Sequence, residues 1–287
     1  MSPTTMSNEE TGIFKKGLKR RPSDEEPIRL FIGTSEHEEP TIEAIYLYSI
    51  FKNTDHPVEV TFLRPSMFPD WKRKGWGTPF TCFRYAIPEL CGFKGRAIYT
   101  DVDMINFRDI YHLWRTNLKG KPFGMVWDSL QMNDKKWQDT EHARGWWCDS
   151  VMLIDCEKAK DWIDPISVQG QWNGTYKWYF MEKIGSPHRK ESSKIVQELD
   201  CRWNSFDGSD TSAFYEPEVK GHRMRKTGFK KVQLPLEEIW QVHLTALSYQ
   251  PWHPKYNPHA KASHNRQDIM EVYWRYNKIV KMIGGIK

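Results

Sequence analysis

The chain has 287 residues and a formal net charge of +5. Its length suffices for one large α/β domain or two small ones, and its mild basicity favours anionic ligands but is too weak to indicate nucleic-acid binding. No apolar run approaches the roughly 18 residues of a membrane-spanning helix, and the polar N-terminus does not resemble a signal peptide. We therefore expect a cytoplasmic protein.

Tryptophans and cysteines give two further indications. The chain contains 14 Trp, whose flat apolar faces and hydrogen-bonding edges suit sugar stacking as well as core packing. Its five cysteines show no Cys-x-x-Cys spacing, and most lie in apolar contexts. They are therefore expected to be reduced core residues of an intracellular protein.

Residues 1–26 are polar and include a basic run at 15–21. This composition predicts a disordered basic tail. Basic residues near an anionic membrane surface are attracted to it by about 1 kcal/mol each. The tail therefore allows peripheral membrane contact at most.

The first expected strand, at 28–32, is followed by three small residues, Gly33, Thr34 and Ser35. Small residues let a ligand approach the backbone, and hydroxyl groups supply hydrogen-bond donors. These three residues are therefore candidates for a nucleotide site. A predicted helix and a second strand at Val58–Leu63 complete the β-α-β start of a doubly wound sheet.

The next segment, 64–81, is a loop rich in Pro, Gly and Trp. Loops of this length are usually functional lids or disordered. Three cations at 72–74 lie between two of its Trp residues, which suits a flap over an anionic substrate. Residues 82–90 are expected to be helical and carry Arg84, which can pair with a carboxylate or a phosphate.

The central feature of the sequence is the segment 95–104. Its residues 97–99 predict a short strand buried on both faces, and the strand leads into Asp101-Val102-Asp103. Side chains alternate along a strand, so Asp101 and Asp103 are expected on the same side. Carboxylate oxygens suit Mg²⁺ or Mn²⁺, and open α/β sheets bind ligands beyond the carboxyl ends of their strands. The pair therefore predicts a metal site, with a solvated turn as the alternative.

The remaining elements continue the alternation of strands and helices. Strands are expected at 123–127, 151–155 and 238–245, and helices at 109–114, 157–163, 176–184 and 268–283. The last strand carries His243. The last helix places five apolar or aromatic residues on one stripe, which predicts a helix docked on the domain: Ile269, Tyr273, Tyr276, Val280 and Ile283.

Together these segments resemble the GT-A glycosyltransferases, specifically family 8, which includes glycogenin and the bacterial lipopolysaccharide galactosyl- and glucosyltransferases. The resemblance implies an α/β, Rossmann-like GT-A fold, with a mixed, mostly parallel sheet flanked by helices in a single domain at 27–260. That domain would have a nucleotide-binding half at 27–128 and an acceptor half at 129–260, followed by a C-terminal amphipathic helix at 261–287. The matching text comprises the β-α-β start and residues 83–90, 96–103, 149–155, 202–204, 242–245 and 250–252.

The resemblance also implies a function. The chain is expected to be a hexosyltransferase that moves a sugar from a nucleotide-sugar donor, UDP-linked by analogy, to a glycan, lipid-linked or small-molecule acceptor, with retention at the anomeric carbon. A divalent cation, Mn²⁺ or Mg²⁺, would be bound by Asp101, Asp103 and His243. An imidazole ligand shifts the preference from Mg²⁺ toward Mn²⁺.

Two departures from the family pattern concern donor binding. Asp149-Ser150-Val151 stands where the family has Asn-x-Gly; Asp149 is a candidate to accept hydrogen bonds from donor-sugar hydroxyls, and Ser150 is a candidate nucleotide-sugar contact. The diphosphate-binding Lys of the family's Lys-Pro-Trp is Gln250 here. Three residues are candidates to restore the lost phosphate contact: His253, Lys255 and Arg84.

A third departure concerns the anomeric carbon. The family's Asp-Gln-x-x-Leu-Asn segment has no match, and Gln197 and Asp200 are candidates to replace it. The departures leave open a catalytically silent nucleotide-sugar or glycan-binding module on the same fold. A metal-dependent nucleotidyltransferase or phosphohydrolase would be expected to show further acidic ligands or a Gly-rich phosphate loop, and the sequence contains neither.

Overall fold

The computed structural model describes most of the central part of the chain. The predicted basic tail, apart from residue 26, the predicted helix at 176–184, and the candidates His253 and Lys255 lie outside the described residues. None of the described helices combines the length and apolarity needed to cross a bilayer. The described residues are 26–38, 40–74, 76, 78–129, 145–171, 192–206, 215–216, 219–220, 234–244, 250–252 and 266–284.

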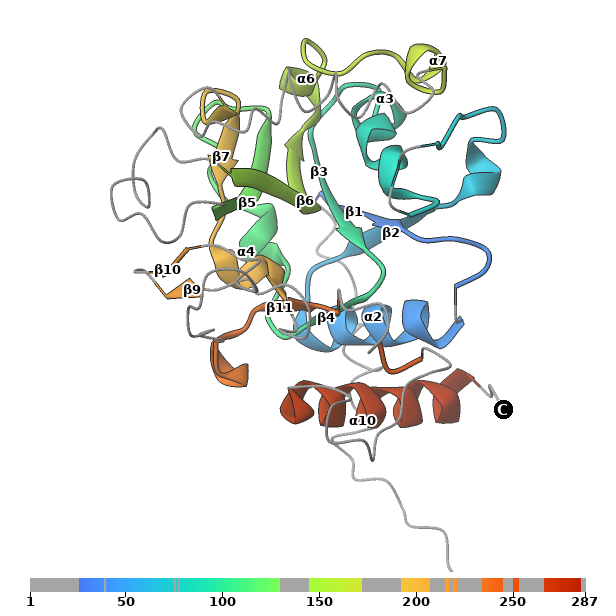
Figure 1. Cartoon of the computed structure of the whole chain (residues 1–287), viewed down its shortest axis with the longest axis vertical. Coiled ribbons are helices and arrows are strands. Elements are labelled where there is room, and N and C mark those ends of the chain that lie inside the picture. Colours follow the sequence, from blue (N-terminus) through green and yellow to red (C-terminus); the bar gives the residue numbers. More distant parts are fainter. Residues whose placement is uncertain are drawn as a thin grey trace, which may run out of the picture.

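A six-stranded mixed sheet occupies the centre of the described part of the molecule, in the order β2-β1-β3-β6-β5-β7 (Figure 1). β1 pairs in parallel with both β2 and β3, and β5 pairs in parallel with β7. β6 is antiparallel to both of its neighbours, β3 and β5. The predicted mixed, mostly parallel sheet is confirmed, and its strands are β1 Ile28–Gly33, β2 Val58–Leu63, β3 Arg96–Asp101, β5 Phe123–Ser129, β6 Gly145–Asp155 and β7 Val196–Glu198.

Helices cover both faces of this sheet because its central strands are apolar on both sides. Leu30 and Ile98 belong to the buried cluster that includes α2 (Pro40–Asn53) and α4 (Tyr111–Trp114). Their neighbours in sequence, Phe31 and Tyr99, belong to the opposite cluster. That second cluster includes the helical turns η2 (Thr81–Ala86), α3 (Ile87–Leu90) and α6 (Cys156–Ala159), with α7 (Ile166–Gln169) at its border.

A smaller three-stranded sheet, β4-β11-β8, adjoins the carboxyl end of β3. Its central strand β11 begins later than the predicted strand at 238–245, because the 3₁₀ turn η5 (Leu236–Glu238) precedes it; Thr245 lies outside the described residues. Its strands are β4 Met104–Asn106, β11 Gln241–His243 and β8 Ser205–Phe206; β9 Tyr215–Glu216 and β10 Val219–Lys220 form a separate pair.

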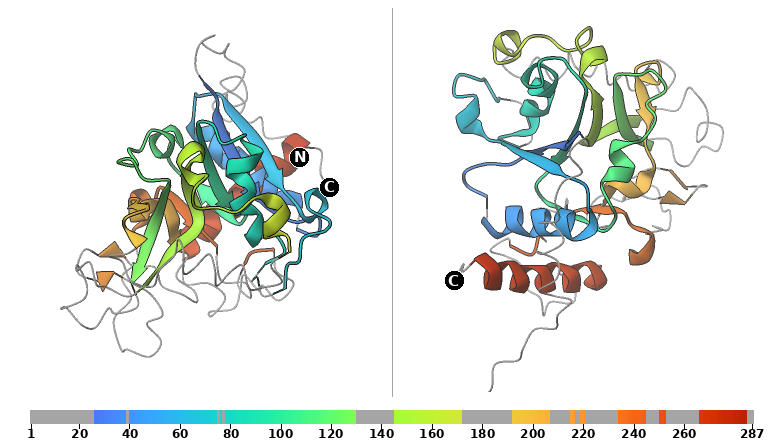
Figure 2. Two further views of the ribbon diagram at one scale, coloured as in Figure 1. Left: turned by 90° about the horizontal axis from the view of Figure 1, so that it is seen from above. Right: turned by 180° about the vertical axis from the view of Figure 1, so that it is seen from behind.

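The last helix, α10 (Gln267–Gly284), lies beside α2, as two opposite views of the ribbon show (Figures 1 and 2). Tyr276 of α10 packs edge-on against Tyr48 of α2, with 4.9 Å between ring centroids. Four residues of the predicted stripe are buried, whereas Ile283 is 47% exposed. The docked helix is therefore confirmed, but its apolar contact ends before Ile283.

Two predicted helices are shorter or tighter than the sequence pattern indicated. The predicted helix at 82–90 begins as 3₁₀ turns, and its α-helical part starts only at Ile87, where Pro88 occupies a favourable position in the first turn. The predicted helix at 157–163 ends at Ala159. Asp155 caps that short helix by accepting a hydrogen bond from the backbone of Lys158 at 3.2 Å.

Candidate active site

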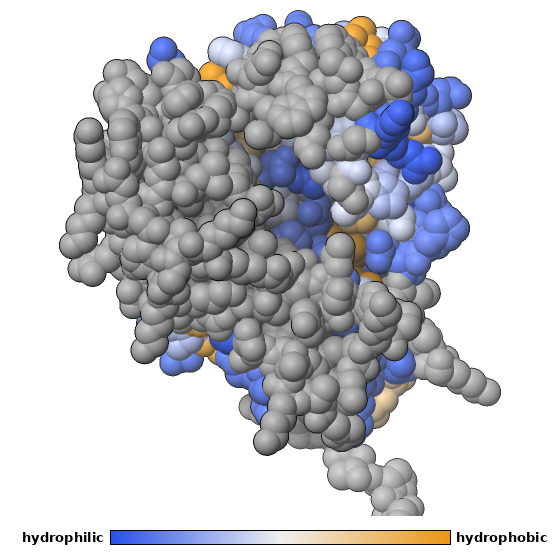
Figure 3. Space-filling view, in the orientation of Figure 1, coloured by the Kyte–Doolittle hydropathy of each residue, from blue (hydrophilic) through white to orange (hydrophobic). Residues whose placement is uncertain are grey.

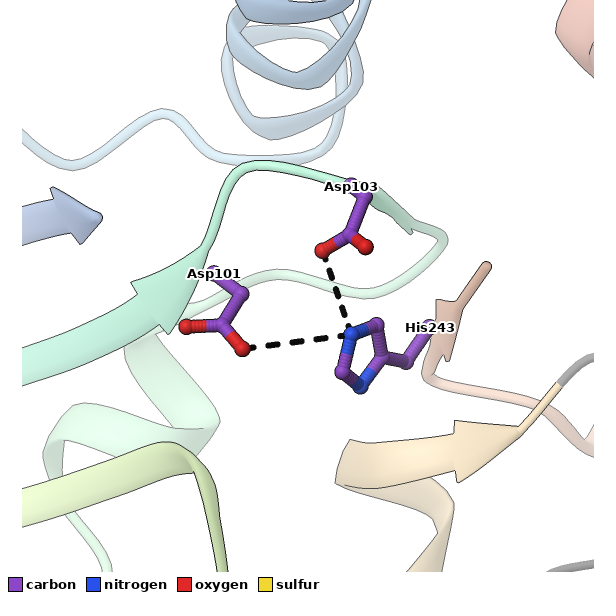
Figure 4. Close-up of side chains that lie close together, drawn as sticks. All are labelled: Asp101, Asp103 and His243. Atoms are coloured by element: carbon purple, nitrogen blue, oxygen red, sulfur yellow. Dashed lines mark ion pairs between the residues drawn. The ribbon is translucent and has the colours of Figure 1, made fainter. Parts of the chain in front are cut away.

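The carboxyl end of β3 brings Asp101, Asp103 and His243 together (Figure 4). β3 ends at Asp101, and Val102 and Asp103 form a bend before β4. Asp103 therefore reaches the site through a bend, not through the strand alternation that the sequence suggested. Because β11 pairs with β4, His243 lies opposite Met104 and points back at the two carboxylates. Its Nε2 is 3.1 Å from Asp103 Oδ1 and 3.9 Å from Asp101 Oδ2.

One oxygen of Asp101 is held by fixed donors. Arg84 donates to Oδ1 from Nη2 at 2.9 Å, and the hydroxyl group of Tyr99 donates to the same oxygen. The other oxygen, Oδ2, faces His243. Burial raises the pKa of the Asp101 carboxyl group, although Arg84 and His243 act in the opposite direction. Arg84 therefore opposes the effect of burial on this carboxyl group.

Arg84 joins Asp101 to Asp149. Its Nη1 lies 2.7 Å from Asp149 Oδ1, its Nε donates to the carbonyl of Thr81 at 2.8 Å, and its side chain is only 2% exposed. Burial alone would lower the pKa of the guanidinium, but Asp101 and Asp149, together with Tyr99, hold this pKa well above its ordinary value. Arg84 is therefore a permanently charged bridge between the two carboxylates.

The geometry of Asp103 mirrors that of Asp101. Its Oδ2 accepts a hydrogen bond of 3.1 Å from Gln250 Nε2, which also donates to the carbonyl of Leu244 at 2.7 Å. Within the described part of the chain, the buried Oδ1 of Asp103 accepts no hydrogen bond, although it lies 3.1 Å from His243 Nε2. Gln250, the counterpart of the family's Lys, thus contacts a carboxylate.

These three side chains fit a divalent cation. One potential ligand atom from each of Asp101, Asp103 and His243 lies within 4.8 Å of the others. Each carboxylate has one oxygen engaged by a donor and the other directed at the imidazole. Two hard oxygens and one imidazole nitrogen form a donor set that suits Mn²⁺ and is compatible with Mg²⁺.

Gly33 lies next to Asp101 in the parallel register of β1 and β3. A Cβ atom at this position would collide with the hydroxyl group of Tyr99 and would lie 2.8 Å from the ring of Phe80. The absence of a side chain therefore makes room for the tyrosine that holds Asp101. This packing role is additional to the ligand approach that the sequence suggested for Gly33.

The hydroxyl groups of Thr34 and Ser35 lie near carboxylates of the same region. Thr34 Oγ1 donates to Glu43 Oε1 at 2.8 Å, and Ser35 Oγ lies 3.5 Å from Glu38 Oε1. Burial, and secondly the charge of Asp103, raise the pKa of Glu38. Glu38 therefore belongs to the electrostatic surroundings of the site.

Asp149 and Ser150 lie on β6, the neighbour of β3. Asp149 accepts from the hydroxyl group of Tyr85 as well as from Arg84, and its side chain remains 34% exposed. Its carboxylate can therefore still be reached by a ligand. Ser150 is buried, and its hydroxyl group accepts a hydrogen bond of 2.9 Å from Asn204.

Gln197 and Asp200 lie further from the three converging side chains. Gln197 is on β7, three strands from β3, which corresponds to a backbone separation of about 14 Å. Asp200 precedes the 3₁₀ helix η3 (Cys201–Asn204) and pairs with Arg202 through both of its oxygens, at 2.9 and 2.6 Å. The structure does not bring either residue into contact with Asp101 or Asp103.

The predicted flap packs on the domain through its aromatic residues; Trp76, for example, lies 5.8 Å from Tyr85 between ring centroids. Trp71 packs on Phe68 and Phe83, and Gly170 of the α7 region leaves space for its ring. Lys72 donates from its backbone to the carbonyl of Gly170 at 2.9 Å, while the cationic side chains of 72–74 are exposed. On the face seen in Figure 3, hydrophilic residues line a hollow near the centre of the molecule.

Comparison with known proteins gives matches to glycosyltransferases. The family model described as glycosyl transferase family 8 matches residues 48–161. The chain is 26% identical over 183 residues to Protein CDI of Arabidopsis thaliana, which covers 57% of this chain and 68% of that protein.

Solved structures of glycosyltransferases share the fold at low sequence identity. The galactosyltransferase LgtC, in complex with donor and acceptor sugar analogs, matches with a TM-score of 0.52 and 12% identity over 89% of this chain and 96% of LgtC. The apo form of GlyE from Streptococcus pneumoniae TIGR4 matches with a TM-score of 0.51 and 14% identity over 91% of this chain and 64% of GlyE.

The sheet and its helical layers have the GT-A fold, and the family-model match together with the solved structures identifies the chain as a glycosyltransferase. Within that class, the chain is a distant relative of glycosyltransferase family 8. This assignment favours a transferase over the silent binding module and over the nucleotidyltransferase or phosphohydrolase.

Sequence reasoning missed three residues that shape the site: Tyr99, Tyr85 and Glu38. Tyr99 was assigned only to the buried strand, yet it alternates onto the same side as Asp101, which is a signal that the period of two contains. Tyr85 follows Arg84 directly, and only the three-dimensional structure shows that both reach Asp149. Glu38 lies in the loop after the first strand, where ligand sites of such sheets occur.

Proposed function

We propose that this glycosyltransferase takes its sugar from a UDP-linked nucleotide-sugar donor and transfers it with retention of configuration at the anomeric carbon. The reaction would use Mn²⁺ or Mg²⁺ held by Asp101, Asp103 and His243. The observation that carries the proposal is the direction of the ligand atoms. One oxygen of each carboxylate is fixed by a donor, and the remaining oxygens and His243 Nε2 face one another. Coulomb repulsion between two such carboxylates is relieved when a cation lies between them.

Cleavage of a sugar–diphosphate bond places negative charge on the leaving phosphate. A bound divalent cation stabilises that charge as a Lewis acid. Side chains of this chain hold the proposed ligands in place: Arg84 orients Asp101 and favours its charged form, and Gln250 fixes Asp103. Both supporting groups are buried, which limits their freedom before the donor binds.

Asp149 is proposed to bind the transferred sugar. Its carboxylate is partly exposed and is linked through Arg84 to Asp101, so it lies beside the proposed diphosphate position. Carboxylate oxygens have spare acceptor capacity for sugar hydroxyl groups even after they accept from Arg84 and Tyr85. Gly33, Thr34, Ser35 and Ser150 remain proposed nucleotide-sugar contacts, and Gln197 and Asp200 remain proposed groups for the anomeric carbon.

The diphosphate contact is assigned to the segment after Gln250. Arg84 is 2% exposed and already engages Asp101 and Asp149, and Gln250 donates to Asp103 and to a backbone carbonyl. His253 and Lys255, which lie three and five positions after Gln250, are therefore the proposed phosphate-binding residues. The acceptor is proposed to be a glycan, a lipid-linked sugar or a small molecule.

The test is UDP release from UDP-sugars, measured with and without Mn²⁺ in the presence of varied acceptors. Asp103→Asn should reduce the rate by at least about 100-fold, or about 2.7 kcal/mol in transition-state stabilisation. The exposed Asp161 lies beyond α6, so Asp161→Asn makes the same charge change outside the site and should leave the rate unchanged. UDP release that is equal with and without cation, or equal in Asp103→Asn and the unsubstituted protein, would contradict the proposal.

A further inference from the structure

A cavity of about 360 Å³ opens at the amino ends of β1 and β2. Its walls include Arg29, Glu59, Thr61 and Cys91. Arg29 precedes Gly33, the neighbour of Asp101, by four residues of β1, which corresponds to about 13 Å along the strand. The cavity is therefore separate from the site at the carboxyl end of β3.

A tight turn at 92–95 positions Cys91. Cys91 ends α3 and donates from its backbone to the carbonyl of Ile87 at 2.9 Å. Gly92, Phe93 and Gly95 then adopt left-handed backbone angles, with φ of 61°, 54° and 63°. This turn returns the chain directly into β3, so Cys91 stays next to the beginning of that strand.

The same turn places Cys156 beside Cys91. β6 ends opposite the beginning of β3, with Asp155 paired to Arg96. Cys156 follows at once, and its backbone N–H donates to the carbonyl of Gly95 at 2.9 Å. Two cysteines that are 65 positions apart in the sequence thereby lie side by side: Cys91 packs against the buried cluster that contains Cys156, where α3 meets α6.

The two thiols have different environments. Cys156 is completely buried, whereas Cys91 is partly exposed and reaches the cavity. The hydrogen bond from Cys156, together with the charge of Arg29, lowers the pKa of the Cys91 thiol despite its partial burial. The same hydrogen bond and burial raise the pKa of Cys156. A partly exposed thiol with a lowered pKa thus lies next to a buried thiol.

We propose that Cys91 and Cys156 form a redox-active thiol pair, in which Cys91 reacts with a hydroperoxide that enters the cavity and Cys156 then closes a disulfide. The Cys91 thiolate attacks one peroxide oxygen, the O–O bond breaks, and Cys91 becomes a sulfenic acid while hydroxide or an alcohol leaves. The Cys156 sulfur then attacks the Cys91 sulfur, the S–O bond breaks, and the thiol proton leaves with the departing oxygen as water. The peroxide is reduced by two electrons, and the two thiols supply them.

The structure favours both steps of this reaction. The two cysteines lie on neighbouring elements, because α3 packs against α6 and the backbone of Cys156 is tied to the turn that follows Cys91. The hydrogen bond and charge of Cys91 raise the pKa of the Cys156 thiol. Oxidation of Cys91 removes both effects, so the Cys156 thiol then loses its proton more readily for the second step. The product would link the end of α3 to the start of α6.

The first test is disulfide mapping of the full-length protein after brief treatment with hydrogen peroxide. Mass spectrometry of peptides prepared without reductant should show one linked pair, Cys91 with Cys156, and reductant should reverse it. A different pairing, or Cys91 that stays reduced at peroxide doses that oxidise Cys201, would overturn the proposal. This experiment needs no substitution and does not depend on glycosyl transfer.

The second test compares alkylation rates at neutral pH. Cys201 is a matched control, because it is also partly exposed but burial raises its pKa to about 12. Cys91 should be alkylated by iodoacetamide at least about tenfold faster than Cys201. Cys156→Ser should prevent the disulfide and leave a sulfenic acid on Cys91 that dimedone traps, and Cys156→Ala serves the same purpose if the serine variant is unstable. Equal labelling of Cys91 and Cys201 would contradict an activated thiol.

Discussion

Substitution of Arg84 by Met tests whether this buried guanidinium holds the site together. Arg84→Met removes the positive charge between Asp101 and Asp149 while it keeps much of the side-chain volume. Both carboxylates then lose their shared partner, with 2.9 and 2.7 Å contacts broken. The variant should therefore be less stable, and the loss should depend on pH.

The magnitude follows from the burial of each partner. Removal of one member of a buried ion pair costs about 3–5 kcal/mol, because the remaining charge is left uncompensated. The Asp101 side chain is 12% exposed and carries most of this cost, whereas the Asp149 side chain is 34% exposed and is partly compensated by solvent. We expect a loss of about 3 kcal/mol in the free energy of unfolding near pH 7.

The pH dependence has a definite sign. Burial raises the pKa of Asp101 and Arg84 lowers it, so the substitution moves this pKa further above the unfolded value. A carboxyl group with a raised folded-state pKa contributes stability that is present below its unfolded pKa of about 4 and is lost as the pH rises through the folded value. The loss caused by Arg84→Met should therefore be larger at about pH 7.5 than at about pH 5.

Urea denaturation in the presence of a chelator measures both effects without a contribution from bound cations. Arg64→Met is the matched control, because Arg64 pairs with Glu43 through both oxygens but the side chains are 30% and 20% exposed. That control should lose about 1 kcal/mol or less. Equal losses in the two variants, or a smaller loss for Arg84→Met at the higher pH, would refute the reasoning.

Three further substitutions test other parts of the account. Gln250→Ala should weaken Mn²⁺ binding, measured by calorimetry, by about 10-fold because it frees Asp103; unchanged affinity would remove Gln250 from the site. Gly33→Ala should lower the free energy of unfolding by about 1–3 kcal/mol through its clash with the Tyr99 hydroxyl, and the loss should shrink when measured in a Tyr99→Phe background. Tyr276→Ala should cost about 3 kcal/mol in urea denaturation, whereas Trp274→Ala, at a ring 42% exposed, should cost much less; equal losses would contradict the docking of α10.

Much of the fold follows from local sequence patterns. The apolar residues of β3 predict a strand buried on both faces, and helices cover both faces of the observed sheet. The stripe on α10 predicts a docked helix because a period of 3.6 residues is strong over 18 residues. The extent of α6 and of the 3₁₀ segment η2 could not be predicted, since these short turns depend on a cap at Asp155 and on tertiary packing around Arg84.

The candidate site was predictable in its ligands but not in its supporting contacts. Asp101 and Asp103 are two positions apart in the sequence, whereas His243 required the family resemblance, because it lies 140 positions after Asp103. The bend at Val102–Asp103, the bridge from Arg84 to Asp149 and the contact from Gln250 to Asp103 come from long-range packing. No short-range pattern encodes such contacts, because each depends on elements far apart in the chain.

The most direct measurement is the binding of Mn²⁺ to the metal-free protein, followed by electron paramagnetic resonance. The account predicts one tight site per chain, lost or weakened by at least about 100-fold in both Asp103→Asn and His243→Gln, and retained in Asp161→Asn. Absence of a tight site in the unsubstituted protein, or a site that both variants retain, would contradict the claim that two carboxylates and one imidazole hold the cation.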